Sequence, residues 1–490
     1  MNLITDKEIK YKLNDKNLTA SVFKLIKTTG RIFIPQCIEK HGRKYKVISI
    51  LRNSFSKFKI DQLTFPEDSA VVSFEPNSIS KTFIKKIKIP PSLQQLKDGW
   101  CDGITGLIDI EVSPRNKFFL YIEDKFLVGK SHEENSQTFD TLYYARYDIK
   151  DALIPPQIKT IKQHSFDRHE NLKTIIFPES SKLKIIEFSA FSCSSISKLI
   201  LPPSVEVIDA SNFSSLRNLV EIEVMQNCAN FLTVDNKFLF KKSSLESEFF
   251  DVFVFCGRNV EEVTIPKNVR VIDRCAFQFC KRLESLMFEP KSSLQIIENS
   301  AFNSCHGLKS IVIPSSVKFV GQHAFSFIES LQSVVFLSSY VELALVCFND
   351  CINLNVLSFQ KAKKIVLNDR DSLRGIPKRA RVEVREDAEL EGPGFNLIMN
   401  QVAYLLEVID DDDDEIGEEP SKGGIENDKD EEEMKDSNEN DKNEEPVIDE
   451  SDFLEEEESE NDSIEKEKST KSSSDNASKD QNDESGSEML

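Results

Sequence analysis

Residues 308–330 read Leu-Lys-Ser-Ile-Val-Ile-Pro-Ser-Ser-Val-Lys-Phe-Val-Gly-Gln-His-Ala-Phe-Ser-Phe-Ile-Glu-Ser and contain two short apolar motifs. The first, Leu-x-x-Ile-x-Ile-Pro, recurs at 172–178 with Phe as its last apolar residue, and at 283–289 with Leu as its second and a Phe-Glu ending. The second, Ala-Phe, recurs at matching distances, at 190–191, 276–277 and 301–302. Because the two motifs return together, the chain is built from one repeated unit.

The last apolar residue of the first motif recurs thirteen times, and most steps between these anchor residues have nearly the same length. A typical step of about 24 residues with this apolar spacing falls in the range of roughly 20–29 that marks a leucine-rich repeat. The sequence therefore predicts a β-dominated α/β solenoid of stacked short parallel strands, with turns or short helices as returns. The anchor residues are Ile34, Phe65, Ile89, Val112, Ile154, Phe177, Leu201, Val224, Ile265, Phe288, Ile313, Phe336 and Phe359.

Each repeat is expected to supply two walls of a common core. In a strand, Leu172, Ile175 and Phe177 point inward, and the Pro that follows ends the strand because it has no N–H to donate. The Val-x-x-Ile segment and the Ala-Phe phenylalanine are expected to fill the opposite wall. One repeat alone buries neither wall, so neighbouring coils have to stack. Thirteen strands spaced ~4.8 Å apart give a solenoid on the order of 60 Å long.

Two steps between anchors are much longer than the others, the one that ends at Ile154 and the one that ends at Ile265. They fall at matching places in the array, which therefore has a superperiod of four strands. The extra segments, 116–127 and 229–239, both carry a polar pair between apolar runs, Glu123-Asp124 and Asp235-Asn236. A polar turn pair in this context favours a β-hairpin. The sequence predicts two hairpin inserts.

These patterns divide the chain into an N-terminal cap (1–33), the solenoid (34–360), a C-terminal cap (361–409) and a tail (410–490). The C-terminal cap begins with a basic stretch at 361–385, and apolar residues then recur at helical spacing over about 395–409. We expect an amphipathic helix there that covers the open end of the solenoid. A partner-binding or membrane-surface helix is the alternative.

The tail carries most of the charge. It has a net charge of −27, whereas residues 1–409 carry +6. With so few apolar residues it is expected to be disordered. Ser459, Ser472 and Ser485 each have an acidic residue three positions on, so they are candidate phosphorylation sites, with an unmodified solubilising tail as the alternative. The opposite charge of the tail and of residues 361–385 suggests that the tail folds back on this stretch.

No catalytic, cofactor or metal site is expected, because the phosphate-loop, zincin and hydrolase motifs are all missing from the sequence. His164 and His323 are repeat positions just before Ser/Ala-Phe. Three cysteines share a packing slot in which reduced Cys acts as a small hydrophobe. The slot holds Cys280, Cys305 and Cys351, and His169, Leu216 and Ile328 in other repeats.

The charge and apolar patterns also bear on partners and compartment. A body charge of +6 without aromatic-basic interleaving argues against nucleic acid as a partner. No apolar run approaches the roughly 20 residues of a transmembrane helix, and the first residues lack the apolar segment of a signal peptide. These features predict a cytoplasmic protein without a transmembrane segment.

A partner is expected on the outward face of the strands, where side chains from successive repeats form columns. The residue before each anchor is apolar in two groups, and exposed apolar columns are interface candidates. The alternative is that these residues only reflect strand preference or lie under another segment. The candidate protein-binding residues are Ile176, Ile200, Met287, Val312 and Val335.

The composite motif Ile-Pro-x-Ser-Val-x-x-Ile-x-x-x-Ala-Phe-x-x-Cys, with its hairpin inserts, resembles the BspA-like leucine-rich repeat of bacteria and parasitic protists. The resemblance covers roughly residues 30–360. It implies an extended binding surface without catalysis, often on the cell exterior, that holds host or matrix proteins and serves adhesion. Two hypotheses follow: a surface-recognition protein with a protein ligand, or an intracellular scaffold or regulator with a phosphorylated acidic tail.

Overall fold

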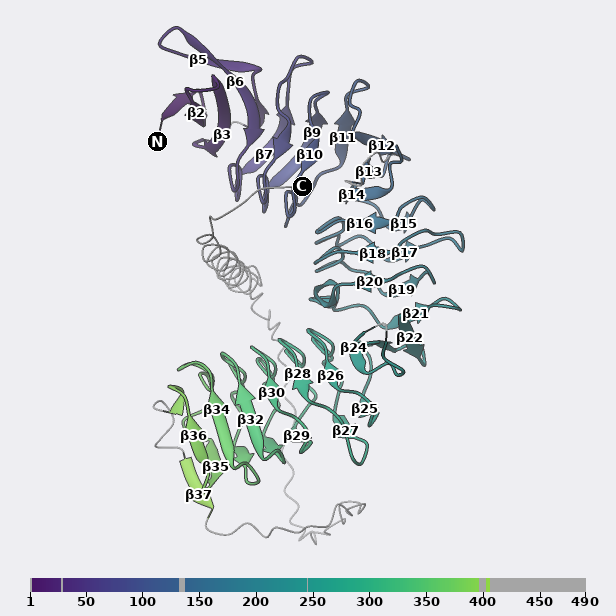
Figure 1. The fold of residues 1–490 in the computed structure, drawn as a ribbon, viewed down its shortest axis with the longest axis vertical. Helices are drawn as coiled ribbons and strands as arrows, with labels where there is room; N and C mark the ends of the chain where they lie inside the picture. The colour runs from purple at the N-terminus through teal and green to yellow at the C-terminus, as the bar shows by residue number, and fades with distance from the viewer. Residues whose placement is uncertain (1, 28–29, 132–136, 245, 396–401, 406–490) are drawn as a thin grey trace, which may run out of the picture. The chain divides into compact units, whose positions relative to one another are not determined.

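The computed structural model describes residues 2–27, 30–131, 137–244, 246–395 and 402–405. It forms a solenoid in which each coil contributes one strand to each of two rows of β-strands (Figure 1). The expectations for the tail at 410–490, including Ser459, Ser472 and Ser485, fall outside the described residues.

The first row, here called the anchor row, contains all thirteen strands predicted from the period, each ending at or just before its anchor residue. The row is divided into four sheets, and neighbours within each sheet pair in parallel. The strands are β4 (Arg31–Phe33), β7 (Lys59–Thr64), β9 (Phe83–Ile89), β11 (Asp109–Val112), β15 (Asp151–Leu153), β17 (Thr174–Ile176), β19 (Lys198–Leu201), β21 (Glu221–Val224), β25 (Glu262–Ile265), β27 (Ser285–Phe288), β29 (Ser310–Ile313), β31 (Ser333–Phe336) and β33 (Val356–Phe359).

The second row is formed by the Val-x-x-Ile wall, which the sequence analysis treated only as packing. Many of its strands are two residues long, too short to give an alternating pattern, and they exist because adjacent coils pair with them. The strands are β6 (Arg43–Ile50), β8 (Ser73–Phe74), β10 (Gln95–Leu96), β14 (Thr141–Ala145), β16 (Thr160–Ile161), β18 (Ile185–Ile186), β20 (Val207–Ile208), β24 (Val252–Cys256), β26 (Val271–Ile272), β28 (Ile296–Ile297), β30 (Phe319–Val320), β32 (Tyr340–Leu343), β34 (Lys364–Leu367) and β36 (Glu389–Glu391).

Both predicted hairpin inserts are confirmed. β12 (Phe119–Ile122) pairs antiparallel with β13 (Phe126–Gly129), and β22 (Phe231–Val234) pairs in the same way with β23 (Phe238–Lys241). Both residues of each turn pair have φ between 51° and 54°, as a two-residue hairpin turn requires. Each hairpin continues antiparallel into β14 or β24, which starts a new parallel ladder.

The N-terminus repeats this plan. β1 (Leu3–Asp6), β2 (Ile9–Asn14) and β3 (Thr19–Leu25) form an antiparallel meander, and β3 then pairs in parallel with β6. A further hairpin joins β5 (Cys37–Lys40) to β6. Residues 1–33, which we expected to act as a cap, therefore begin the first of three similar superunits, here defined as an antiparallel meander followed by parallel coils.

The returns between the rows are turns rather than the expected short helices. In the described chain the exception is a single 3-10 turn, η1 (Ala210–Phe213). The residue before Ala-Phe and the residue four positions later both have positive φ, as at Ser300 (55°) and Ser304 (60°). This conformation turns peptide groups toward the next coil, so the N–H of Phe302 donates to the carbonyl of Ala324 at 2.8 Å. The turns thus form a third hydrogen-bonded ladder.

The excess phenylalanine lies in the core. Phe277, Phe302, Phe325 and Phe348 stack in consecutive coils with ring centroids 4.8, 5.2 and 5.4 Å apart. All four are fully buried. The packing slot predicted for the cysteines is also buried in every coil, and the thiol of Cys305 lies 3.0 Å from the carbonyl oxygen of Phe277.

The C-terminal prediction is wrong in two respects. Both rows continue beyond residue 360: β35 (Arg381–Arg385) extends the anchor row, and β34 and β36 extend the second row. The helix expected over 395–409 is replaced at Val402–Leu405 by strand β37, which pairs in parallel with β35. The open edge of β35 offers unpaired backbone groups, and pairing with them outweighs the helical spacing of the apolar residues. Residues 396–401 and 406–409 lie outside the described chain.

The basic stretch at 361–385 is partly neutralised by its own neighbours. Lys364 pairs with Glu389 and Glu391, at 3.2 and 2.5 Å, and Arg385 pairs with Asp387 at 2.7 Å. The contact between this stretch and the tail stays a prediction, and fewer of its charges are available for such a contact than the sequence suggested.

The phenylalanine stack gives a test of the core. Replacing Phe302 by Ala should lower the free energy of unfolding by about 3–5 kcal/mol, because a fully buried ring is lost and its two stacked neighbours lose contact. Urea unfolding followed by circular dichroism measures the change. Phe249, which is 62% exposed, is the matched control, and its change to Ala should alter stability by less than about 0.5 kcal/mol.

His323 gives a pH test of the same coil. Burial lowers the pKa of His323 to about 4, so the folded protein holds this imidazole neutral. As the pH falls from about 6.5 toward 4, this imidazole is protonated in the unfolded chain but stays neutral in the folded protein. The free energy of unfolding therefore falls by up to about 3 kcal/mol. Changing His323 to Ser, the residue at the equivalent position 300, should remove this part of the pH dependence in denaturation measured from pH 7 to 4. An unchanged pH profile would contradict this assignment.

Candidate functional site

The predicted outward residues of the anchor row do face away from the core. Ile176, Met287 and Val312 are 49%, 53% and 51% exposed, whereas Ile200 and Val335 are half-buried. Each lies beside a buried strand residue, because alternate residues of a strand point to opposite faces. No segment in the described part of the chain covers the three exposed side chains.

The first apolar group is larger than predicted. Leu153 of β15 lies in register with Ile176 of β17 and is 54% exposed. Ile200 follows on β19 and is opposite Glu223 of β21, where the apolar column ends. Leu153 carried the same sequence signal, the position before an anchor, and the sequence analysis did not include it among the site residues.

The second group spans two sheets. Met287 pairs with Thr264 across β25 and β27, and Val312 pairs with Val335 across β29 and β31. The column then ends at Ser358. β27 and β29 are neighbours that belong to separate ladders. The structure therefore places the five predicted residues in two groups on one row of strands, as the sequence suggested.

In the first superunit, β9 and β11 of the anchor row carry charged side chains, whereas Phe33 on β4 is apolar and 54% exposed. Lys86 pairs with Asp109 at 2.9 Å, and Lys88 pairs with Glu67 at 3.0 Å and Glu111 at 3.5 Å. Hydrogen bonds from Arg115 and Lys88 lower the pKa of Glu67 to about 2. These opposite charges satisfy one another, so this part of the face offers little net attraction for a charged partner.

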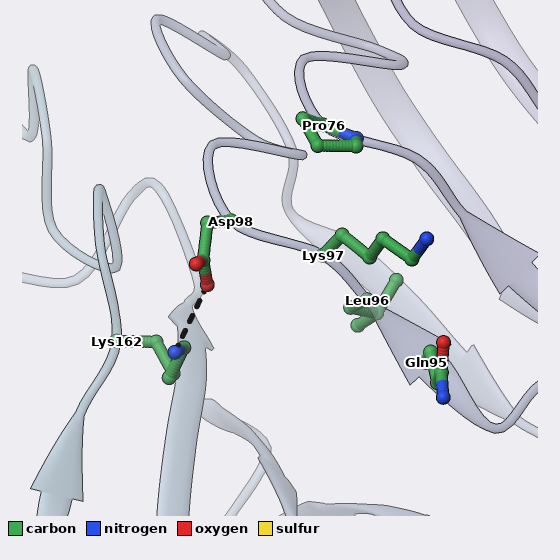
Figure 2. A pocket seen from close by; sticks show the side chains of 6 residues that line it. All are labelled: Pro76, Gln95, Leu96, Lys97, Asp98 and Lys162. Atoms are coloured by element: carbon green, nitrogen blue, oxygen red, sulfur yellow. Dashed lines mark ion pairs between the residues drawn. The ribbon is translucent and has the colours of Figure 1, made fainter. Parts of the chain in front are cut away.

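Superunits one and two meet where the turn after β10 lies against the turn after β16, here called the first junction. A hollow at this junction is lined by Pro76, Gln95, Leu96, Lys97, Asp98 and Lys162 (Figure 2). Asp98 and Lys162 form an ion pair of 3.0 Å across it, and Lys162 also pairs with Glu187 at 2.8 Å. The hollow has charged walls whose charges are already paired.

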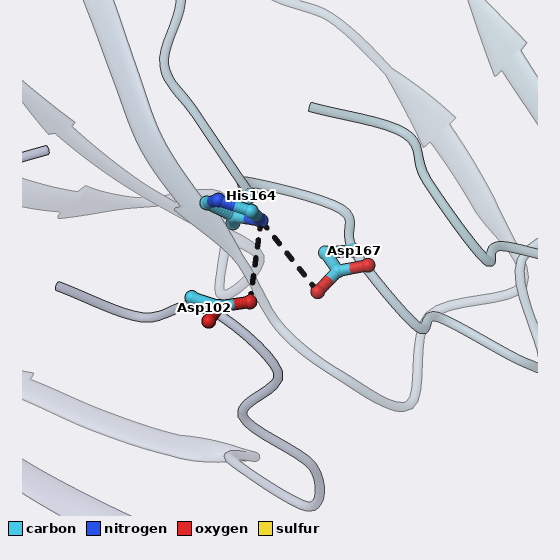
Figure 3. Close-up of side chains that lie close together, drawn as sticks. All are labelled: Asp102, His164 and Asp167. Carbon is cyan, nitrogen blue, oxygen red and sulfur yellow. Dashed lines mark ion pairs between the residues drawn. The ribbon is translucent and has the colours of Figure 1, made fainter. Parts of the chain in front are cut away.

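The same junction holds a buried cluster of Asp102, His164 and Asp167, here called the junction cluster (Figure 3). The Nδ1 atom of His164 lies 3.6 Å from Oδ1 of Asp102 and 3.7 Å from Oδ2 of Asp167. Burial raises the pKa of Asp102, against the nearby charge of His164. The three side chains offer one nitrogen and two carboxylate oxygens within 4.8 Å of one another.

The sequence analysis identified His164 only as a repeat position and did not single out the two aspartates. The i, i+3 spacing of His164 and Asp167 was visible in the sequence, but Asp102 comes from an earlier coil, on the other side of a hairpin insert. The insert separates these coils in the sequence while the stacking brings them together, so the cluster is a product of the tertiary fold.

The two rows, the hairpin inserts and the buried phenylalanine ladder define a leucine-rich-repeat solenoid protein. The BspA type leucine rich repeat region, in six copies, matches residues 16–126, 137–251 and 248–369. The chain belongs to this family. No curated protein matched the chain.

Several solved structures are similar to the chain. A leucine rich cell surface protein from Faecalibacterium prausnitzii A2-165 is 19% identical, with a TM-score of 0.43, 83% of this chain and 99% of that chain being covered. The pneumococcal vaccine antigen PcpA is 18% identical, with a TM-score of 0.41 and coverage of 82% and 97%. A leucine-rich repeat protein from Eubacterium ventriosum ATCC 27560 is 13% identical, with a TM-score of 0.40 and coverage of 80% and 92%.

Among the described residues, no helix combines the length and the apolar character needed to cross a bilayer.

Proposed function

We propose that this chain is a non-enzymatic protein-binding solenoid of the BspA type, whose role is adhesion or recognition of a host or matrix protein. The observation that carries the proposal is the pair of exposed apolar groups on the anchor row, around Ile176 and around Met287 and Val312. Membership of the family supports binding through such an extended face.

The proposed face has the physical properties of a binding surface. Covering a half-exposed Ile, Met or Val side chain contributes about 1 kcal/mol, so a few of them supply a substantial part of a micromolar affinity. The side chains stand on hydrogen-bonded parallel strands, so little backbone conformational entropy is lost when a partner covers them. The charged face of the first superunit would lie at the rim of such a contact.

A second candidate is an intracellular scaffold or regulator that uses the same face. The observation that favours it is that all ten cysteines are free thiols, seven of them buried. Free thiols persist most readily in a reducing compartment. The two candidates share the binding surface and differ in where the protein meets its partner.

The binding face can be tested by changing Met287, Val312 and Val335 together to Ser. Since about 3 kcal/mol of apolar contact is removed, binding to a panel of immobilised host-matrix proteins should weaken about 100-fold. Biolayer interferometry measures the affinity, and thermal unfolding checks that the variant is folded.

The matched control changes Ile185 and Val207 to Ser. These residues are 37% and 52% exposed and pair in register, but they lie on β18 and β20 of the second row. This variant should bind as the unchanged protein does. Equal affinities for both variants would refute the assignment of the face.

The compartment is tested on intact cells that produce the protein. If the protein recognises external partners, external protease should remove it while an internal marker stays intact. Full protection until the cells are lysed would favour the scaffold hypothesis and contradict the adhesion role.

A further inference from the structure

At the first junction, a side chain replaces the backbone ladder of the turns. Within a superunit, the N–H of Lys81 donates to the carbonyl of Asp102 at 2.6 Å in the next coil, and the N–H of Arg168 donates to Ser192 at 2.9 Å. Gly103 occupies the same turn position between them. Its N–H donates instead to Oδ2 of Asp167, at 3.1 Å.

At the second junction, the turn after β20 lies against the turn after β26, and the equivalent hydrogen bond goes to an uncharged side chain beside the buried guanidinium of Arg258. There the N–H of Ser215 donates to Oε1 of Gln278 at 2.8 Å. By the superperiod of four strands, Ser215 corresponds to Gly103 and Gln278 corresponds to Asp167. An amide oxygen therefore suffices for the architectural hydrogen bond.

The same correspondence covers the rest of the junction cluster. Asp102 corresponds to Ser214, and His164 corresponds to Cys275. The second junction thus has no ionised side chain at any of the three positions. Since the fold does not require the two carboxylates and the imidazole, their concentration at the first junction calls for a separate reason.

The distances between the three donor atoms of the junction cluster provide such a reason. Separations of 3.6 and 3.7 Å between Nδ1 of His164 and the two carboxylate oxygens are too long for hydrogen bonds. They are close to the distance between ligand atoms in a tetrahedral metal site, about 3.3–3.4 Å when metal–ligand bonds are about 2.0–2.1 Å. The three donor atoms lie within 4.8 Å of one another, and each aspartate turns one oxygen toward the same nitrogen of His164 (Figure 3).

Asp102 provides the independent observation. Its Oδ1 atom faces His164, the residue is only 6% exposed, and the other carboxylate oxygen, Oδ2, has no hydrogen-bond partner among the described residues. A buried carboxylate oxygen without a partner is costly, whereas a bound cation would offset that cost. The positive charges of Lys81 and Arg168 also act on this carboxylate.

We propose that Asp102, His164 and Asp167 bind a divalent transition-metal ion of the zinc class, which fastens the first superunit to the second. One imidazole nitrogen and two carboxylate oxygens are ligands that Zn²⁺ accepts, and water completes the tetrahedron. The N–H of Gly103 orients the Asp167 carboxylate as an outer-sphere donor. The ion replaces, at this junction, the backbone hydrogen bonds that join the turns elsewhere.

The test uses the full chain, stripped with EDTA and titrated with Zn²⁺ by isothermal calorimetry. One equivalent should bind and raise the melting temperature, and Co²⁺ in its place should give the visible absorption of a tetrahedral site. Asp102→Asn, and the double variant Asp102→Ser with Asp167→Gln that copies the second junction, should weaken Zn²⁺ binding by at least about 100-fold. Asp98→Asn, in the same turn but outside the cluster, is the control and should bind normally.

Two outcomes of the titration would overturn the proposal: no binding of one equivalent by the unchanged protein, or retention of that binding in Asp102→Asn. The metal-free comparison separates a metal ligand from a purely structural acid. In EDTA, Asp102→Asn should melt at the same temperature as the unchanged protein or higher, because it removes a buried charge. A clear loss of stability without metal would show that the carboxylate serves the protonated imidazole of His164 instead, and would also overturn the proposal.

Discussion

The structure depends on hydrogen bonds between the backbones of consecutive coils. No coil can satisfy its own backbone, because its strands are short and find their parallel partners only in the coils before and after. Three ladders run through the stack: the anchor row, the second row and the turns with positive φ. The phenylalanine rings follow at the same spacing, from 4.8 to 5.4 Å between stacked neighbours, so ladder and core set each other's register.

The hairpin inserts interrupt this rule, and the two junctions they create are closed by side chains. At the second junction, Arg258 is buried and donates to the backbone carbonyls of Phe213, Leu216 and Ala276, which its guanidinium can satisfy at once. At the first junction, the corresponding space is occupied by aromatic rings, and the junction cluster lies beside it. At the junctions, the repeat pattern does not set the type of each buried residue. Charged side chains such as Asp102 and Arg258 can therefore be buried there.

On the outward face of the anchor row, side chains rather than backbone groups are available for contacts. Within the ladders the backbone groups of neighbouring strands bond to one another, so the side chains of the anchor row are the groups available to a partner. The repeat places an equivalent side chain on each strand. A charge pair occupies this position on β9 and β11 of the first superunit, and apolar side chains occupy it around Ile176 and Met287. The proposed protein-binding role rests on this difference along the anchor row, in a member of the BspA type family.

The sequence by itself determined the features that are set within one repeat: the thirteen anchor strands, the inward phenylalanines, the cysteine slot and the two hairpins with their turn pairs. Each depends on local alternation or turn chemistry, which a single coil records. Tertiary structure alone decided the two-residue strands of the second row, the replacement of the expected helix by β37 at Val402–Leu405, and the meeting of Asp102 with His164. These depend on the edge that a neighbouring coil presents, and the energy of pairing with that edge exceeds the weak local preference of a few residues.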